Sequence, residues 1–218
     1  MENEREMARS PSLVATERVR NHGTRRLGIC SATHGEVITS ENMIFVGGIH
    51  GVGKTTVCKV IHDEFQIDHY SASTLIANAK REEFGVVKQV ADIETNQDFL
   101  TRAFRDMQIG SRWFLLDGHF CLINTRSQIT RVPEDTFRQL APRGIISIQD
   151  TVNEIKGRLL SRDNLVYDEL FLEQFQDEEL CYAVELANMM NIPHVVFHAN
   201  ERQVCKLEEF LRTVGAIV

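Results

Sequence analysis

The feature that most constrains this chain is the glycine-rich segment Gly48–Thr55. It reads GIHGVGKT and matches the pattern G-x-x-x-x-G-K-[ST] at every fixed position. The apolar run 43–46 precedes it, and a helical pattern over 54–65 follows it. Glycines let the backbone wrap closely around a phosphate chain with its N–H groups pointing inward, and the positive end of the next helix adds to the attraction. The segment therefore predicts a phosphate-binding loop between a buried strand and a helix.

The residue types in this loop predict ATP and Mg²⁺ as ligands. The Lys54 ammonium is expected to bridge the β- and γ-phosphates, and the Thr55 hydroxyl is expected to bind the metal ion. The loop alone does not decide the fate of the phosphate, because switch proteins, motor-type ATPases and small kinases share it. The residues expected to contact the nucleotide are Gly48, His50, Gly51, Val52, Gly53, Lys54, Thr55 and Thr56.

Short apolar runs alternate with helical patterns along the rest of the chain. Such alternation indicates a parallel sheet covered on both faces, so we expect an α/β fold, a doubly wound three-layer sandwich with a five-stranded parallel sheet. The expected strands are 43–46, 67–70, 112–116, 145–148 and 195–197. The expected helices are 54–65, 71–83, 96–109, 134–141, 151–162, 168–190 and 201–213.

The chain divides near residue 42. Residues 1–42 carry six arginines and six acidic residues and show no sustained apolar periodicity, so they predict a flexible N-terminal arm that could dock a protein partner. Residues 43–218 are expected to form one ATP-binding domain, which carries the whole net charge of −7. A domain this acidic is a poor candidate for wrapping nucleic acid.

Composition excludes further classes of protein. No run of 18 apolar residues suggests a membrane span, and the N-terminus lacks the apolar core of a signal peptide and the acid-poor character of a transit peptide. The five cysteines are scattered, without a C-x-x-C pair, which favours reduced thiols. We therefore expect a cytoplasmic protein.

Asp117 directly follows the apolar strand expected over 112–116, at the edge where a doubly wound sheet forms its ligand crevice. A carboxylate there could hold Mg²⁺ through water or orient an attacking hydroxyl; the alternative is a residue that only caps a turn. His119 follows and could contact a phosphate or an acceptor hydroxyl, or serve only the local structure.

Arg158 and Arg162 stand four residues apart on the expected helix 151–162, so they share a face. They could clamp a transferring phosphoryl group, or form an ordinary solvated face.

The chain resembles the small P-loop kinases of the adenylate-kinase-like branch. It is most similar to small bacterial AAA-type ATP-binding proteins and archaeal-type adenylate kinases. The resemblance covers 43–218. It implies a five-stranded parallel sheet, ATP with Mg²⁺, transfer of the γ-phosphoryl group to a small acceptor, and arginines on the lid helix that face the phosphates. The stretches that carry it are Gly48–Thr55, Tyr70–Ile76, Phe114–Gly118, Ile146–Arg162 and Pro193–Asn200.

The chain departs from adenylate kinases in its cations. His119-Phe120 stands where an arginine is usual, and no Lys or Arg occurs between Arg162 and Arg202, where 169–185 is strongly acidic. Few cations remain to neutralise a nucleoside monophosphate. This argues more strongly against an adenylate kinase than against kinases in general. The segment Cys121–Pro133 predicts a hairpin over the acceptor pocket. Its Arg126 or Arg131 could replace the missing arginine, or the hairpin could lack a chemical role.

Together these features predict an ATP-dependent phosphotransferase acting on a nucleotide, a nucleoside or another metabolite. Its expected catalytic residues are Lys54, Asp117, Arg158 and Arg162, and its expected metal ligands are Thr55 and Asp117. The alternative is an ATP-dependent switch or regulatory ATPase that acts on a protein partner through the arm 1–42 and the acidic helix 169–185.

Overall fold

The computed structural model describes residues 42–84, 97–98, 100–103, 112–163, 167–200 and 204–218. The arm expected over 1–42 lies outside the described residues except for Asn42, as does much of the helix expected over 96–109. The arm therefore stays a prediction.

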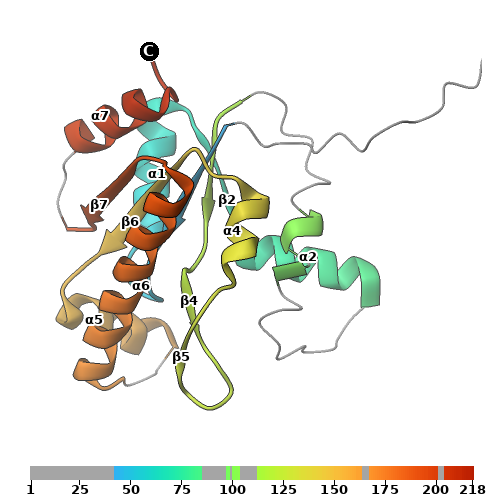
Figure 1. Ribbon diagram of the computed structural model, residues 1–218. Coiled ribbons are helices and arrows are strands. Elements are labelled where there is room, and N and C mark those ends of the chain that lie inside the picture. Colours follow the sequence, from blue (N-terminus) through green and yellow to red (C-terminus); the bar gives the residue numbers. More distant parts are fainter. Residues whose placement is uncertain (1–41, 85–96, 99, 104–111, 164–166, 201–203) are drawn as a thin grey trace, which may run out of the picture. The chain divides into compact units, whose positions relative to one another are not determined.

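Five parallel strands form the central sheet, in the order β2-β3-β1-β6-β7 (Figure 1). The strands are β1 (Met43–Gly47), β2 (Asp68–Ser71), β3 (Phe114–Asp117), β6 (Gly144–Gln149) and β7 (His194–His198). Every residue of β1 and β3 is buried, because both strands lie inside the sheet with helices over each face. The doubly wound α/β fold with a five-stranded parallel sheet is thus confirmed.

The helices form the outer two layers. They are α1 (Lys54–Phe65), α2 (Ala72–Phe84), α4 (Glu134–Leu140), α5 (Val152–Asp163), α6 (Glu169–Met190) and α7 (Val204–Val214). Figure 1 shows α1 and α7 over one face of the sheet and α4 and α6 over the other. Among the described helices, none has the length and apolar character needed to cross a bilayer.

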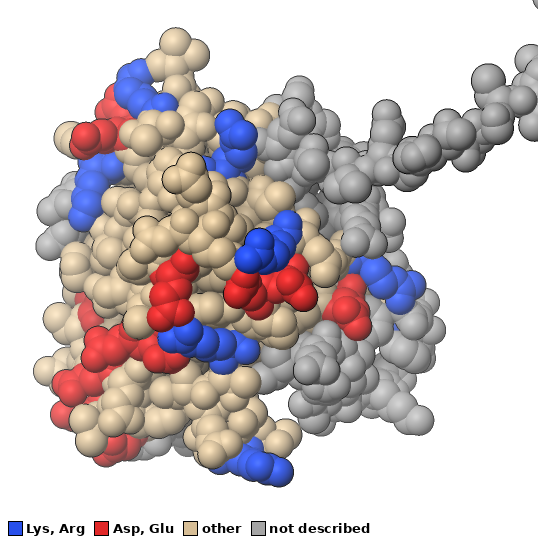
Figure 2. All heavy atoms as spheres, viewed as in Figure 1, with Lys and Arg blue, Asp and Glu red and all other residues tan. Residues whose placement is uncertain are grey.

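The expected hairpin is confirmed as a second, antiparallel sheet of β4 (Cys121–Ile123) and β5 (Ile129–Arg131). Its Arg131 lies 2.6 Å from carboxylate oxygens of both Glu178 and Glu185 on α6, and 4.6 Å above the ring of Tyr182. On the face shown in Figure 2, acidic and basic side chains lie next to one another in this way. Arg131 therefore joins the hairpin to α6, and the described structure does not place it in an acceptor pocket.

Three aromatic rings form the core between β1 and α4. The ring centroids of Phe45 and Phe120 are 5.1 Å apart, those of Phe45 and Phe137 are 5.3 Å apart, and those of Phe120 and Phe137 are 5.7 Å apart. All three side chains are fully buried. This cluster fixes the spacing between the sheet and α4, and so helps to define the cavity described below.

Candidate functional site

The glycine-rich loop joins the end of β1 to the start of α1, and its conformation requires glycine. Gly48, Gly51 and Gly53 have φ angles of 147°, 77° and 105°, in the region that side chains disfavour. A Cβ atom on Gly48 would also lie 2.6 Å from the carbonyl oxygen of Ile148. Gly53 immediately precedes α1, so the loop lies at the helix N-terminus, where an anion is favoured.

Lys54 folds back across this loop. Its Nζ donates to the carbonyl oxygens of Gly48 at 2.6 Å and Ile49 at 3.1 Å. Burial lowers the pKa of Lys54, and the carboxylates of Glu179 and Asp117 oppose that shift. The carbonyls and nearby carboxylates favour the charged form of the ammonium group, which is thus held where a phosphate chain on the loop would meet it.

A cavity of about 1120 Å³ opens on this loop. It brings together most of the site residues expected from the sequence, from the loop, the end of β3 and helix α5. Those that line it are His50, Gly51, Gly53, Lys54, Thr55, Thr56, Asp117, Arg158 and Arg162. Gly48 and Val52 do not line the cavity: the Gly48 carbonyl binds Lys54, and the Val52 side chain is fully buried.

Asp117 is held by the neighbouring strand. The Nε2 atom of His69, on β2, hydrogen bonds to Oδ2 of Asp117, whose residue is only 7% exposed. This contact makes the carboxylate part of a His–Asp pair at the floor of the cavity. His69 was not predicted as a site residue, although it lies in an expected strand that runs parallel to the strand of Asp117.

The donor atoms present fit a magnesium ion. Thr55 offers a hydroxyl and Asp117 a carboxylate, both line the cavity, and Mg²⁺ prefers oxygen ligands. His69 binds one carboxylate oxygen of Asp117 and leaves the other. The thiol of Cys58 also lies near, since the ligand atoms of Cys58, His69 and Asp117 are within 4.8 Å of one another. Burial and the charge of Asp117 raise the pKa of this thiol, so Cys58 stays protonated at neutral pH and is a poor metal ligand.

Arg158 supports the loop through hydrogen bonds to its backbone. Its Nη1 donates to the carbonyl oxygens of Gly51 at 3.1 Å and Val52 at 3.2 Å, and its Nη2 donates to Oδ2 of Asp150 at 2.5 Å. Arg162, one helical turn later, lines the same cavity. Both arginines thus line the cavity, with Arg158 half-buried and Arg162 exposed, and their part in the chemistry stays a prediction.

A buried carboxylate that the sequence did not predict as part of the site lies near the loop. Glu179, in the middle of α6, accepts hydrogen bonds from the backbone N–H groups of Phe120 at 3.0 Å and Cys121 at 3.3 Å. Its Oε1 lies 3.5 Å from Nδ1 of His119, and the ring centroids of His119 and His50 are 4.2 Å apart. Burial raises the pKa of Glu179, lowers that of His50 to about 3 and lowers that of His119.

Glu179 belongs to the acidic stretch 169–185, which the alternative function offered as a docking surface, but its side chain is buried and cannot contribute to such a surface. The sequence did carry a signal, because Glu179 falls on the apolar face of α6. The buried residues on this face are Leu172, Phe175, Gln176, Glu179, Tyr182, Ala183, Leu186 and Ala187. An acidic residue in phase with such a series is expected to be buried and hydrogen bonded.

The sequence profile of the AAA domain family matches residues 47–173, which is more than half of the chain. The chain belongs to the AAA domain family. The matched part of this AAA domain contains the phosphate loop, Asp117, Arg158 and Arg162. The match agrees with the resemblance to AAA-type ATP-binding proteins noted from the sequence. A search of curated proteins found no match to the chain.

Solved structures resemble the chain at low sequence identity. A gluconokinase from Sinorhizobium meliloti 1021 is 11% identical over 80% of this chain and 91% of its own, with a TM-score of 0.46. A sugar kinase from Janibacter sp. HTCC2649 is 15% identical over 80% of this chain and 96% of its own, with a TM-score of 0.44. An uncharacterized protein from Eubacterium ventriosum ATCC 27560 is 13% identical over 80% of this chain and 99% of its own, with a TM-score of 0.43.

Proposed function

We propose that this AAA domain protein transfers the γ-phosphoryl group of ATP to a hydroxyl group of a small molecule. The observation that carries the proposal is the extent of the cavity. It begins at the phosphate loop, passes Asp117 and continues between α2 and α4, with a volume of about 1120 Å³. Pockets for a single ligand measure about 300–1,000 Å³, so this cavity has room for a second ligand beside a triphosphate. An ATPase that serves as a switch needs room only for water at this place.

The residues of the site would have separate roles in binding ATP, holding Mg²⁺ and stabilising the transferring group. The loop amides and Lys54 would hold the β- and γ-phosphates, and Thr55 and Asp117 would hold Mg²⁺. The metal ion would neutralise charge on the phosphate oxygens. Arg162, with Arg158 beside it, would stabilise the charge that develops on the transferring group.

Asp117 would also orient the acceptor. The acceptor oxygen forms a bond to the γ-phosphorus while the bond from that phosphorus to the departing ADP oxygen breaks. The hydroxyl proton passes to the carboxylate of Asp117. The hydrogen bond from His69 fixes the direction of this carboxylate and leaves its second oxygen, which could accept both the acceptor hydroxyl and a water molecule bound to Mg²⁺.

The test is a search for an acceptor. ADP formation would be measured with purified full-length protein, ATP and Mg²⁺, first alone and then with small-molecule and protein fractions of a cell extract. A phosphotransferase should form ADP at least tenfold faster with a small-molecule fraction, and the product should carry the labelled γ-phosphate. Stimulation by the protein fraction alone, with release of inorganic phosphate, would instead favour the regulatory ATPase. Lys54→Ala is the control for activity that does not arise from this site.

A further inference from the structure

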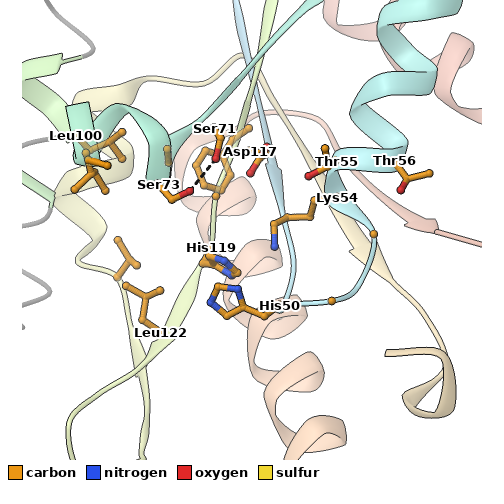
Figure 3. A pocket seen from close by; sticks show the side chains of 18 of the residues that line it. His50, Lys54, Thr55, Thr56, Ser71, Ser73, Leu100, Asp117, His119 and Leu122 are labelled. Atoms are coloured by element: carbon orange, nitrogen blue, oxygen red, sulfur yellow. Dashed lines mark hydrogen bonds between the residues drawn. The ribbon is translucent and has the colours of Figure 1, made fainter. Parts of the chain in front are cut away.

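The cavity has two compartments of opposite character. The phosphate compartment lies on the loop and α5 and carries the cations Lys54, Arg158 and Arg162. The other, which we call the acceptor compartment, lies beyond Asp117 between α2, β4 and α4. Most of its described lining is apolar, namely Phe45, Ala72, Ile76, Ala77, Leu100, Leu122, Val132, Phe137 and Leu140. Figure 3 shows Leu100 and Leu122 on the far side of the cavity from Lys54 and Thr55.

The polar groups of the acceptor compartment are fewer than the apolar ones and are mostly neutral. Among the described residues they are Ser71, Ser73, Gln97, Thr136 and His119, with Asp117 and Lys80 as the charged groups. The hydroxyl groups of Ser71 and Ser73 form a hydrogen bond, with 3.0 Å between their oxygens. In Figure 3 this pair lies beside Asp117, at the end of the compartment nearest the phosphate loop.

The described part of this lining favours an uncharged ligand. Removing a phosphate monoester or a carboxylate from water is unfavourable unless cations with fixed donors replace the lost hydration. Within the part of the chain that the structure describes, one lysine lines this compartment, whereas three cations line the phosphate compartment. A polyhydroxylated ligand would also fit poorly, because many of its hydroxyl groups would face carbon atoms.

We propose that the acceptor compartment takes an uncharged alcohol with an apolar or aromatic body, of which nucleosides are an example, in preference to a nucleoside monophosphate or a sugar acid. This inference rests on the proposed function, since it names the class of acceptor. The hydroxyl group would lie beside Asp117 and the pair of Ser71 and Ser73. The body would contact the apolar side chains between α2 and α4.

Matched pairs of compounds test the inference. Nucleosides would be compared with their 5′-monophosphates, aryl alcohols with the corresponding carboxylic acids, and glucose with gluconate. Binding would be measured by calorimetry on full-length protein saturated with a non-hydrolysable ATP analogue and Mg²⁺. We expect the uncharged member of at least one nucleoside or aryl pair to bind at least tenfold more tightly than its charged partner. The inference is overturned if charged members bind as well or better, if only the sugars bind, or if nothing binds.

ADP formation with the same compounds separates the inference from the proposed function. A compound that binds with the expected preference and speeds ADP formation tenfold supports both. A compound that binds with this preference but receives no phosphoryl group supports the ligand class and contradicts phosphoryl transfer. Acceleration by charged compounds alone supports transfer and overturns the ligand class.

A matched pair of variants locates the ligand. Leu122→Lys places a charge in the acceptor compartment, whereas Leu170→Lys places one on α6 at a residue that is 60% exposed. Leu122→Lys should weaken binding of the uncharged ligand at least tenfold and leave binding of the ATP analogue within twofold; Leu170→Lys should change neither. Retained ligand binding in Leu122→Lys would overturn the placement. Ile76→Gln, on the α2 wall, is the second variant with the same expectation should Leu122→Lys fail to fold.

Discussion

Arg158 and Asp150 form an ion pair next to the phosphate loop, with 2.5 Å between Nη2 and Oδ2. The Asp150 side chain is 2% exposed, and its Oδ1 also accepts the backbone N–H of Thr151 at 2.8 Å. The same guanidinium binds the carbonyls of Gly51 and Val52. Arg158 therefore joins the turn after β6 to the loop, and its first effect is on the conformation of that loop.

Replacement of Arg158 should accordingly reduce stability as well as ATP binding. Arg158→Ala removes the hydrogen bonds to Gly51, Val52 and Asp150 and leaves the buried Asp150 carboxylate without its cation, so we expect a loss of about 1–3 kcal/mol in the free energy of unfolding. Urea unfolding measures it. Arg138→Ala is the control, because Arg138 pairs with Glu134 on an exposed face, where such a pair contributes about 0–1 kcal/mol. Equal stability of the two variants would show that the Asp150 contact contributes little.

Lys54→Ala should weaken ATP binding without unfolding the protein. It removes the cation held over the loop and keeps the loop amides. Charge-assisted hydrogen bonds contribute about 1.5–3 kcal/mol, so affinity should fall by roughly ten- to a hundredfold. Calorimetry with ATP and Mg²⁺ measures this. Lys59→Ala, at an exposed position on the same helix, should bind like the parent protein. Unchanged binding in Lys54→Ala would contradict the assignment of the loop.

The sheet and the loop could be predicted because their signals are local. The buried strands read as short apolar runs, and the loop carries its glycines and lysine within eight residues. The helical spacing of Arg158 and Arg162 also places both on one face without knowledge of the fold. Each of these predictions depends on residues that are near one another in the chain.

The remaining parts of the site depend on contacts between distant segments. The hydrogen bond between His69 and Asp117 joins residues that are 48 positions apart in the sequence. The hydrogen bond from the backbone N–H of Phe120 to Glu179 joins residues that are 59 positions apart. Arg131 illustrates the same limit, since the sequence could not show that its partners are Glu178 and Glu185 on α6. Pairing of this kind follows from the packing of α6 against the sheet and hairpin.

Buried histidines should make the protein less stable in mild acid. Burial lowers the pKa values of His119 and His194, whereas an unfolded histidine titrates at about 6.5. Below that pH the unfolded chain binds protons at these histidines that the folded chain does not, so they should lower the free energy of unfolding as the pH drops from 7.5 to 5. The raised pKa of Glu179 acts in the opposite direction, so the effect of the histidines is read from the difference between a histidine variant and the parent protein. Urea titrations at several pH values measure the slope.

A substitution of His194 tests this prediction. Its Nε2 lies 2.9 Å from the hydroxyl oxygen of Ser147, and His194→Gln keeps a polar group at that place. The variant should lose less stability on acidification than the parent protein. His62→Gln, which changes an exposed residue on α1, is the control and should follow the parent curve. A steeper acid loss in His194→Gln than in the parent would contradict the assignment.

The domain should fold without the first 39 residues. Residues 1–42 lack a periodic apolar face, whereas Met43 begins the central strand β1 and the carbonyl of Asn42 accepts the N–H of Phe114 at 3.1 Å. A protein that begins at Ser40 keeps both. We expect its melting temperature to lie within about 4 °C of the full-length value, which corresponds to a change of roughly 1 kcal/mol for a domain of this size. A loss of solubility or of ATP binding would place part of the arm in the domain.

Variants of Arg162 separate a role in phosphoryl transfer from a role in ATP binding. Contacts with the transferring group strengthen in the transition state, so their loss lowers turnover more than ground-state affinity. An arginine of this kind can contribute about 10³–10⁵ in rate, and we expect less here because Arg158 lies one turn away. Arg162→Ala should leave ATP binding within a few-fold of the parent and lower acceptor-dependent ADP formation at least tenfold. Arg162→Lys should restore little, because an ammonium group does not reproduce the planar two-donor fork. Lys156→Ala, which removes a partly exposed cation from the same helix, should keep full turnover. Parent-like turnover in both Arg162 variants would remove Arg162 from the proposed mechanism.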